Sequence, residues 1–251
     1  MRVLIACESS GVSREAWRKL GHDAWSCDLL PADDGSQYHI QGSVLDILAG
    51  IESGTFGGER FEDLSSLDQE KVNLGIIDED LDEWDLMIAH PPCTYLTNSA
   101  EWAYGDGPYH QKVKEGTLVG LERREARHKA IDFVYKLMRA QIGMIAIENP
   151  IGALSSRIKP PSQYIQPYEY GEDASKKTCL WLKGLPILEK TTQYPARMVE
   201  WPKGSGKKVK RWGNQTDSGQ NKLSPGADRW KERSKTYQGW ADAMAQQWGQ
   251  L

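Results

Sequence analysis

The sequence predicts an α/β fold with a mostly parallel sheet and helices on both of its faces. Three observations lead to this prediction: short apolar runs typical of buried strands, amphipathic segments between them, and polar residues directly after the runs. In an open sheet of this kind, ligands bind at the edge formed by the carboxyl ends of the strands. The residues that follow each apolar run are therefore the candidate site.

The first unit is a strand over 2–7, a small polar turn and a helix over 14–20. Ser13 is expected to cap this helix through its side chain, and Gly21 is expected to end it. Such a turn points backbone amides and a helix amino terminus towards a ligand.

A second strand, 24–27, is closed by Asp28, which is the position from which an acid can bind ribose hydroxyls. The preceding turn contains Gly11 but lacks the full glycine pattern of a phosphate loop, so a ligand without phosphate fits better. Residues 42–47 predict a third short strand with Asp46 at its end. Residues 52–83 are glycine-rich and then acidic, which predicts a partly mobile surface insertion.

The run 85–89 predicts a buried strand that Pro91 and Pro92 stop, because proline cannot donate to a sheet ladder. Cys93 follows at once, at the carboxyl end of this strand. His90 is interpreted as a loop residue. The glycine-containing stretch 94–117 is a candidate active-site loop or lid.

A long amphipathic helix is predicted over 118–140, with Arg123 and Arg127 on its solvated face. The next strand, 144–147, ends in Glu148. Burial at the edge of an apolar strand is expected to favour the neutral form of that carboxyl group.

Residues 178–182 predict another strand, led by Lys176 and Lys177, and a closing helix is predicted over 239–248. Between them the chain is irregular, with tryptophans that are more consistent with packing than with base stacking, namely Trp201, Trp212 and Trp230. The expected organisation is a catalytic domain over 1–188, a small basic recognition region over 189–232, and a carboxyl-terminal helix over 233–251 that returns to the first domain.

The net charge of −4 conceals an asymmetry. Residues 52–85 hold twelve acidic and two basic residues, whereas 197–235 hold eleven basic and four acidic ones, a net of +7. The basic segment predicts a polyanionic partner. The chain has no run of ~18 apolar residues, no signal-peptide pattern and no metal-ligand spacing among its four cysteines. We therefore expect a cytoplasmic, monomeric protein without a metal and with no membrane contact.

A thiol and a carboxyl group at neighbouring strand ends suit one reaction in particular. A thiolate can add to C6 of a pyrimidine and turn C5 into a carbon nucleophile, provided that charge is absorbed at N3. A carboxylic acid beside N3 can donate a proton there. Because N3 of cytosine is an acceptor and N3 of uracil carries hydrogen, Glu148 favours cytosine.

The chain resembles the cytosine-C5 DNA methyltransferases, in particular their short phage- or prophage-type members. Pro91-Pro92-Cys93 matches the nucleophile motif of the family, and Glu148-Asn149-Pro150 matches its Glu-Asn-Val. The opening strand and turn, 5–11, look like its methyl-donor motif. Asp28 stands where the family places the acid that binds the donor ribose.

The resemblance implies a Rossmann-like S-adenosylmethionine-dependent methyltransferase fold and methyl transfer to C5 of flipped-out cytosine in DNA, with S-adenosylhomocysteine as the second product. The implied catalytic residues are Cys93, Glu148 and Lys177. The implied donor-binding residues are Cys7, Glu8, Ser9, Gly11, Asp28, Leu29, Asp46 and Pro91. The DNA contacts are expected from Lys176, Lys207, Lys208, Lys210 and Arg211.

Some positions depart from the family pattern. Its Gln-x-Arg-x-Arg motif is missing, and a segment with Lys176 and Lys177 takes the comparable place, so either lysine can replace the arginine contact. Ser43 stands where the family often has an adenine-binding Asp. Three alternatives stay open: methylation of cytosine in RNA or in a free nucleotide, methylation of an exocyclic amine, and a DNA-binding relative without activity.

Overall fold

The computed structural model describes residues 1–49, 55–56, 59–60, 84–224 and 229–251. The insertion expected over 52–83 therefore lies largely outside the described residues. Two short strands within it are described, β4 (Thr55–Phe56) and β5 (Glu59–Arg60), and they pair antiparallel.

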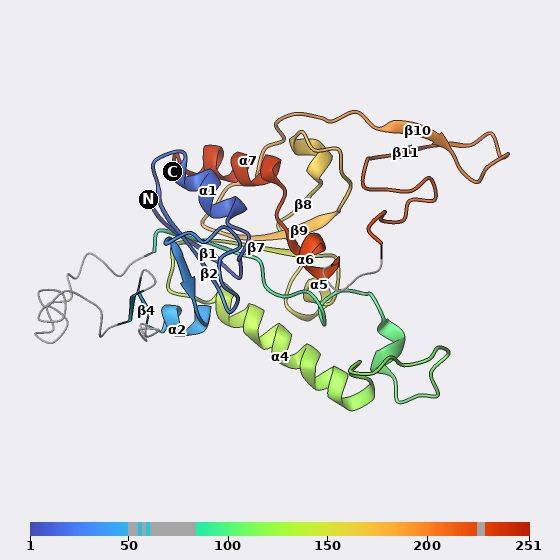
Figure 1. Ribbon diagram of the computed structural model, residues 1–251, viewed down its shortest axis with the longest axis horizontal. Coiled ribbons are helices and arrows are strands. Elements are labelled where there is room, and N and C mark those ends of the chain that lie inside the picture. Colours follow the sequence, from blue (N-terminus) through green and yellow to red (C-terminus); the bar gives the residue numbers. More distant parts are fainter. Residues whose placement is uncertain (50–54, 57–58, 61–83, 225–228) are drawn as a thin grey trace, which may run out of the picture.

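A seven-stranded sheet forms the centre of the molecule, in the order β3-β2-β1-β6-β7-β9-β8 (Figure 1). Its strands are β1 (Arg2–Ala6), β2 (Asp23–Asp28), β3 (His39–Gln41), β6 (Leu86–Ala89), β7 (Met144–Pro150), β8 (Gln163–Ile165) and β9 (Thr178–Lys183). The first five positions in this order are parallel, and β9 runs antiparallel to both of its neighbours. The predicted α/β class and the mostly parallel sheet are confirmed.

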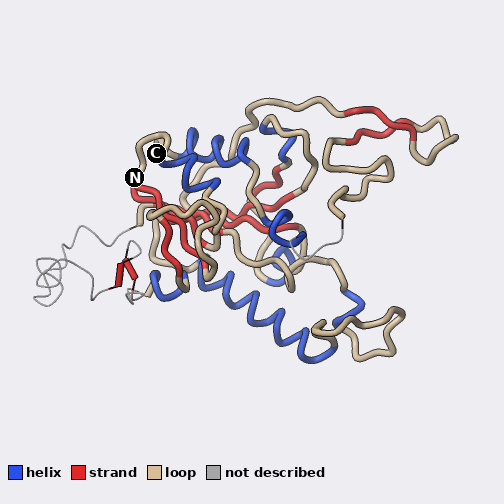
Figure 2. Tube along the Cα trace, in the orientation of Figure 1, coloured by secondary structure: helices blue, strands red, loops and turns tan. Residues whose placement is uncertain are grey.

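Helices cover both faces of the sheet (Figures 1 and 2). One face carries α1 (Val12–Arg18) and α7 (Gln238–Trp248), and the opposite face carries α2 (Val44–Leu48) and α4 (Gly120–Met138). The shorter helices are η2 (Glu101–Tyr104), α5 (Leu154–Arg157), η3 (Pro167–Tyr170) and α6 (Arg229–Ser234).

Alternation along the strands divides the apolar side chains into two cores. Ile5 and Ile88 pack with Trp17 and Trp240 under α1 and α7. Their neighbours in sequence point the other way, and Met87, for example, packs beneath α4. Strands that are buried on both faces explain why the sequence shows continuous apolar runs instead of alternation.

Two predictions about the first unit are wrong. Helix α1 begins at Val12, and Ser13 does not cap it through its side chain. Residues 44–48 are helical, and the third strand is β3, directly before them. Asp46 therefore lies in the first turn of a helix. Val44, Ile47 and Leu48 follow the spacing of a helical face, which outweighs the β propensity of their side chains in so short a segment.

The arginines of α4 do not form the predicted solvated face. Arg123 is buried beside the rings of Tyr95 and Tyr104. Arg127 donates to the Tyr95 carbonyl at 2.9 Å and pairs with Glu101 at 2.5 Å. These arginines hold the candidate loop 94–117 against the helix, so the start of that loop is anchored.

After β9 the chain leaves the sheet and forms an antiparallel hairpin, β10 (Arg197–Glu200) and β11 (Lys208–Arg211), that extends away from the core (Figure 1). Sequence reasoning missed these strands and β8. Trp212 stacks on Tyr168 with ring centroids 4.0 Å apart, which confirms a packing role for it. Trp201 is partly exposed, and the side chain of Trp230 lies outside the described residues. Among the described helices, none is long and apolar enough to cross a membrane.

Candidate functional site

Three chain segments meet at the carboxyl edge of the sheet. Ala89 on β6 is in register with Ile147 on β7, so the residues after them, including Cys93 and Glu148, lie at the same edge. Because β9 is antiparallel, it starts where β7 ends, and Thr178 is opposite Pro150. The segment before β9 therefore lies at the same edge as Cys93 and Glu148.

Backbone contacts hold the thiol segment against the end of β7. Asn149 donates its side-chain amide to the Pro91 carbonyl at 2.8 Å. Ala153 donates to the Leu96 carbonyl at 2.7 Å. Gly152 lies so close to the same carbonyl that a Cβ atom there would collide with it. Glycine is therefore required at this position because the two backbone segments lie so close together, and not because the backbone has to be flexible.

Cys93 is half-buried, and its carbonyl accepts from the amides of Leu96 and Thr97 at 2.9 and 3.1 Å. Burial raises the pKa of the Cys93 thiol, and the charge of Glu148 raises it further. The charges of Lys176 and Arg233 act in the opposite direction and lower that pKa. The thiol is therefore mostly protonated in the free protein, with two cations near enough to stabilise its thiolate.

Glu148 is 8% exposed. Its Oε2 atom lies 3.1 Å from His90 Nδ1, and its Oε1 atom has no hydrogen-bond partner within the described part of the chain. Burial raises the pKa of Glu148, but the charge of Lys176 and the contacts with His90 and Thr178 outweigh it, so the pKa lies below its usual value. The expectation of a neutral carboxyl group is wrong for the free protein, because nearby cations and donors overcome desolvation.

The two adjacent lysines face different surroundings. Lys176 is half-buried, acts electrostatically on both Glu148 and Cys93, and donates to the Arg233 carbonyl at 3.2 Å. Lys177 is exposed, and its ammonium lies 4.4 Å from the centre of the Tyr164 ring. Side chains two residues apart lie on the same face of an extended segment. The side chain of Lys176 therefore points, like that of Thr178, towards Glu148. The structure thus places Lys176 at the site and Lys177 beside it.

His90 belongs to the site, although its sequence position suggested an ordinary loop residue. Leu86 and Ile88 point to the face of the sheet that α1 and α7 cover, so the same alternation brings His90 to that face. Ala146 points there too, and Glu148 follows it by two residues. Counting alternation outward from the two apolar runs would have placed His90 and Glu148 side by side.

At the end of β1 the backbone turns sharply, and a carboxylate fills the amino terminus of α1. Cys7 has a φ of 60°, in the left-handed region that is uncommon for a residue with a side chain. The turn directs Glu8 onto the helix, where it accepts from the amides of Ser13 and Arg14 at 2.8 and 3.3 Å. Glu8 is 4% exposed and already neutralises this end of the helix.

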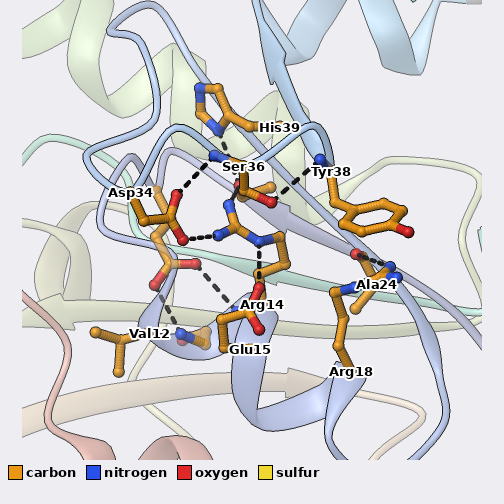
Figure 3. A network of polar contacts seen from close by, with 12 residues as sticks. Val12, Arg14, Glu15, Arg18, Ala24, Asp34, Ser36, Tyr38 and His39 are labelled. Carbon is orange, nitrogen blue, oxygen red and sulfur yellow. Dashed lines mark hydrogen bonds and ion pairs between the residues drawn. The ribbon is translucent and has the colours of Figure 1, made fainter. Parts of the chain in front are cut away.

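A buried arginine organises the loop that follows β2 (Figure 3). Arg14 has no exposed side-chain surface, and it contacts Asp34, Glu15 and the Ser26 hydroxyl. The Ser26 hydroxyl in turn lies 2.8 Å from His39 Nδ1. A Cβ atom at position 11 would collide with the guanidinium of Arg14 and with Asp34, so Gly11 is required by this packing as well as by its φ of 73°.

The other residues predicted to bind a donor lie along the same edge. Asp28 accepts from the Leu30 amide at 2.9 Å, and Leu29 between them is 73% exposed. Burial, followed by the charges of Asp28 and Asp46, raises the pKa of Cys27 to about 12, which places both carboxylates near that buried thiol. The remaining three residues follow β1 or β6, namely Cys7, Ser9 and Pro91.

Helix α6 links the two sides of this edge. Lys231 pairs with Asp33 at 2.7 Å, on the loop that Arg14 organises. Two residues later, Arg233 is near enough to Cys93 to lower the pKa of its thiol. In the sequence, only the general excess of basic residues in this region indicated a role for the helix.

The predicted DNA-binding lysines lie on the hairpin. Lys207, Lys208 and Lys210 are exposed. Arg211 is half-buried, and its guanidinium donates to the carbonyls of Asp217 and Lys210 at 3.0 and 2.8 Å. Arg211 therefore supports the hairpin, whereas the three lysines are available to a ligand.

Comparison of the chain with protein-family models and with curated proteins found no match.

Proposed function

We propose that the protein transfers a methyl group from S-adenosylmethionine to C5 of cytosine in DNA. One observation carries the proposal: Cys93 and Glu148, far apart in the sequence, meet at the carboxyl edge of the sheet, and one buried oxygen of Glu148 has no hydrogen-bond partner among the described residues. A buried polar atom without a partner costs free energy, so its persistence indicates a ligand group that completes it.

The opposite part of the edge fits a donor that carries a positive charge and no phosphate. The amides of α1 that would bind a phosphate are already bonded to Glu8. The strand ends here present the Asp28 carboxylate next to the exposed side chain of Leu29, which suits the ribose and the apolar face of a nucleoside. When bound, the donor supplies an electrophilic methyl group.

Cys93 acts as the nucleophile in this proposal. Its thiolate, stabilised by Lys176 and Arg233, forms a bond to C6 of the pyrimidine. The C5–C6 electron pair shifts towards C4, and N3 takes up a proton. The methyl group then joins C5, a base removes the C5 proton, and the Cys93 sulfur leaves with restoration of the ring double bond.

Glu148 holds the N3 proton. It is ionised in the free protein, so the proton that it passes to N3 has to be taken up when the base enters. The lone pair of cytosine N3 opposite Oε1 favours that uptake, because two acceptors cannot share a contact without a hydrogen between them. N3 of uracil carries hydrogen and can donate to the ionised carboxylate, but it has no lone pair to accept a proton from it. Proton delivery to N3, and with it the addition step, therefore favours cytosine.

The basic hairpin supports DNA as the substrate. Three exposed lysines on one short hairpin offer contacts to phosphates without sequence selectivity. A cytosine in a duplex has to leave the stack before Cys93 can reach C6.

Bisulfite sequencing of duplex DNA incubated with the protein and the donor tests the proposal. Protected cytosines are expected with the wild-type protein and none with Cys93→Ser. Parallel reactions with RNA and with free cytidine nucleotides separate the open alternatives. Methylation of these substrates but not of DNA would contradict the DNA assignment, and no transfer to any of them would contradict the activity.

A salt titration tests the hairpin separately. Each phosphate contact adds about 0.9 to the slope of log affinity against log salt concentration. Replacing Lys207, Lys208 and Lys210 with Gln should flatten that slope by roughly two to three. Replacing the exposed Lys19 and Lys129, which lie on α1's end and on α4, should leave it unchanged. An unaltered slope in the triple variant would show that phosphates bind elsewhere.

A further inference from the structure

His90 makes two side-chain contacts that have no role in the reaction steps proposed above. Its side chain is 8% exposed. Nδ1 lies 3.1 Å from Glu148 Oε2, and Nε2 lies 3.5 Å from the Ser13 hydroxyl. The ring therefore joins the amino-terminal turn of α1 to the carboxylate at the end of β7.

The backbone fixes where this ring can be. The His90 amide donates to the Ala6 carbonyl at 2.9 Å, which continues the pairing of β6 with β1. Pro91 follows immediately and restricts the chain. On the far side, the Ser13 amide is bonded to buried Glu8, so the hydroxyl that contacts the ring is held as well. Few other orientations of the imidazole satisfy both of its nitrogens.

The direction of the hydrogen bond follows from the charge of its partner. An ionised carboxylate can only accept, so Nδ1 carries the hydrogen in the contact with Glu148. Nε2, on the other side of the ring, lies 3.5 Å from the Ser13 hydroxyl. With Oε2 engaged in this way, the carboxylate presents Oε1, the atom without a described partner, to the place where a base would bind.

We propose that His90 is a positioning residue for proton transfer between Glu148 and N3 of the target base, an inference that rests on the function proposed above. As the Cys93 sulfur bonds to C6, the hydrogen on Oε1 moves to N3 and leaves a negative charge on the carboxylate. The Nδ1 hydrogen of His90 stabilises that charge through Oε2. When water, as the base, takes the C5 proton and the sulfur leaves C6, the hydrogen on N3 returns to Oε1, so the Glu148 carboxyl group ends in the state in which it began the step.

The two amide replacements of histidine separate its two contacts. The side-chain nitrogen of Asn can occupy the position of Nδ1, whereas that of Gln reaches the position of Nε2. His90→Asn keeps the contact with Glu148 and loses that with Ser13, and His90→Gln does the reverse. We expect single-turnover methylation to fall by about ten- to a hundredfold in His90→Gln, as for the loss of a hydrogen bond to a charged group. His90→Asn should stay within several-fold of wild type, as should Ser13→Ala.

A second readout does not depend on methyl transfer. The Glu148 carboxyl carbon can be followed by ¹³C NMR against pH, with Glu148→Gln used to assign its signal. The contact with His90 lowers the pKa of Glu148, so that pKa should rise in His90→Gln and stay close to wild type in His90→Asn. Lys176 and Thr178 act on the same carboxyl group and remain in both variants.

The two readouts distinguish failure of this inference from failure of the proposed function. Absence of methylation by the wild-type protein would refute the function, while the NMR titration would still test the contact. Equal rates and equal Glu148 titration in His90→Asn and His90→Gln would overturn the positioning role. A slow His90→Asn variant with a normal Glu148 titration would also overturn it, since the preserved contact would then have no effect on the chemistry.

Discussion

The two halves of the ligand edge use their polar groups differently. On the side of β1 and β2, the carboxylates are bonded within the protein: Glu8 to amides of α1, Asp34 to Arg14, and Asp33 to Lys231. On the side of β6 and β7, Glu148 keeps one oxygen without a partner in the described structure, and the neighbouring thiol is half-buried.

This difference indicates which residues contribute to the stability of the fold and which are available for a reaction. A polar group bonded inside the protein stabilises the fold, and its loss should appear in the free energy of unfolding. A buried oxygen without a described partner does not stabilise the fold, so under the proposed function its change should appear in the rate of reaction.

Cys93→Ser should abolish covalent trapping on DNA that contains 5-fluorocytosine. The wild-type protein should be trapped in the presence of donor, because fluorine replaces the C5 proton that has to leave. A serine hydroxyl is a much weaker nucleophile than a thiolate. Denaturing gels report the complex, and Cys179→Ala, which changes a buried thiol on β9, serves as the control. A shifted band with Cys93→Ser would contradict the assignment.

Glu148→Gln should slow single-turnover methylation by about a hundredfold or more, because Gln keeps the shape but cannot transfer a proton. DNA affinity should change little, since the interaction belongs to the transition state. Rapid-quench measurements give the rate, and Glu122→Gln, on the exposed surface of α4, is the matched control. A rate close to that of wild type, or equal methylation of uracil, would refute the cytosine mechanism.

Arg14→Met should reduce the free energy of unfolding by about 2 kcal/mol, since Asp34 and the Ser26 hydroxyl each lose the contact with the buried guanidinium. Urea denaturation measures this loss. Lys19→Met, on the exposed end of the same segment, should change stability by less than about 0.5 kcal/mol. A loss for Arg14→Met as small as that of the control would show that the network in Figure 3 does not stabilise the fold.

Asp28→Ala should weaken binding of S-adenosylmethionine by about 1–3 kcal/mol through lost hydrogen bonds to a charged group. Calorimetry measures the dissociation constant. Asp23→Ala, at the opposite end of β2, is the control, because it lies away from the ligand edge. Equal affinities for the wild type and Asp28→Ala would mean that the donor does not bind at the end of β2.

Lys176→Met should slow alkylation of Cys93 several-fold, because the charge of Lys176 lowers the pKa of that thiol and its removal leaves less of the reactive thiolate. Lys177→Met should have no effect, since its ammonium lies over Tyr164. Mass spectrometry after timed iodoacetamide treatment follows the modification. The rate for the wild type should keep rising with pH above the usual range of a cysteine thiol, because burial and the charge of Glu148 raise the pKa of Cys93. Equal slowing in both lysine variants would exclude a specific role for Lys176.

Much of the fold could be predicted from local patterns. The apolar runs that became β1, β6, β7 and β9 were visible because strands buried on both faces of a sheet carry little besides apolar residues. The short strands were not: β8 and the hairpin lack such runs. The helix α2 was mistaken for a strand, since five residues are too few to separate the two periodicities.

The sequence by itself determined that the sheet is mostly parallel and that Cys93 and Glu148 lie at one edge, because helical segments alternate with the apolar runs and both residues directly follow such runs. Only the tertiary structure decided the state of the site. The ionisation of Glu148 depends on His90, which follows β6, and on Lys176 and Thr178 at the start of β9. The choice of Lys176 over Lys177 depends on the register of β9 against β7, and a register is a property of paired strands rather than of either strand alone.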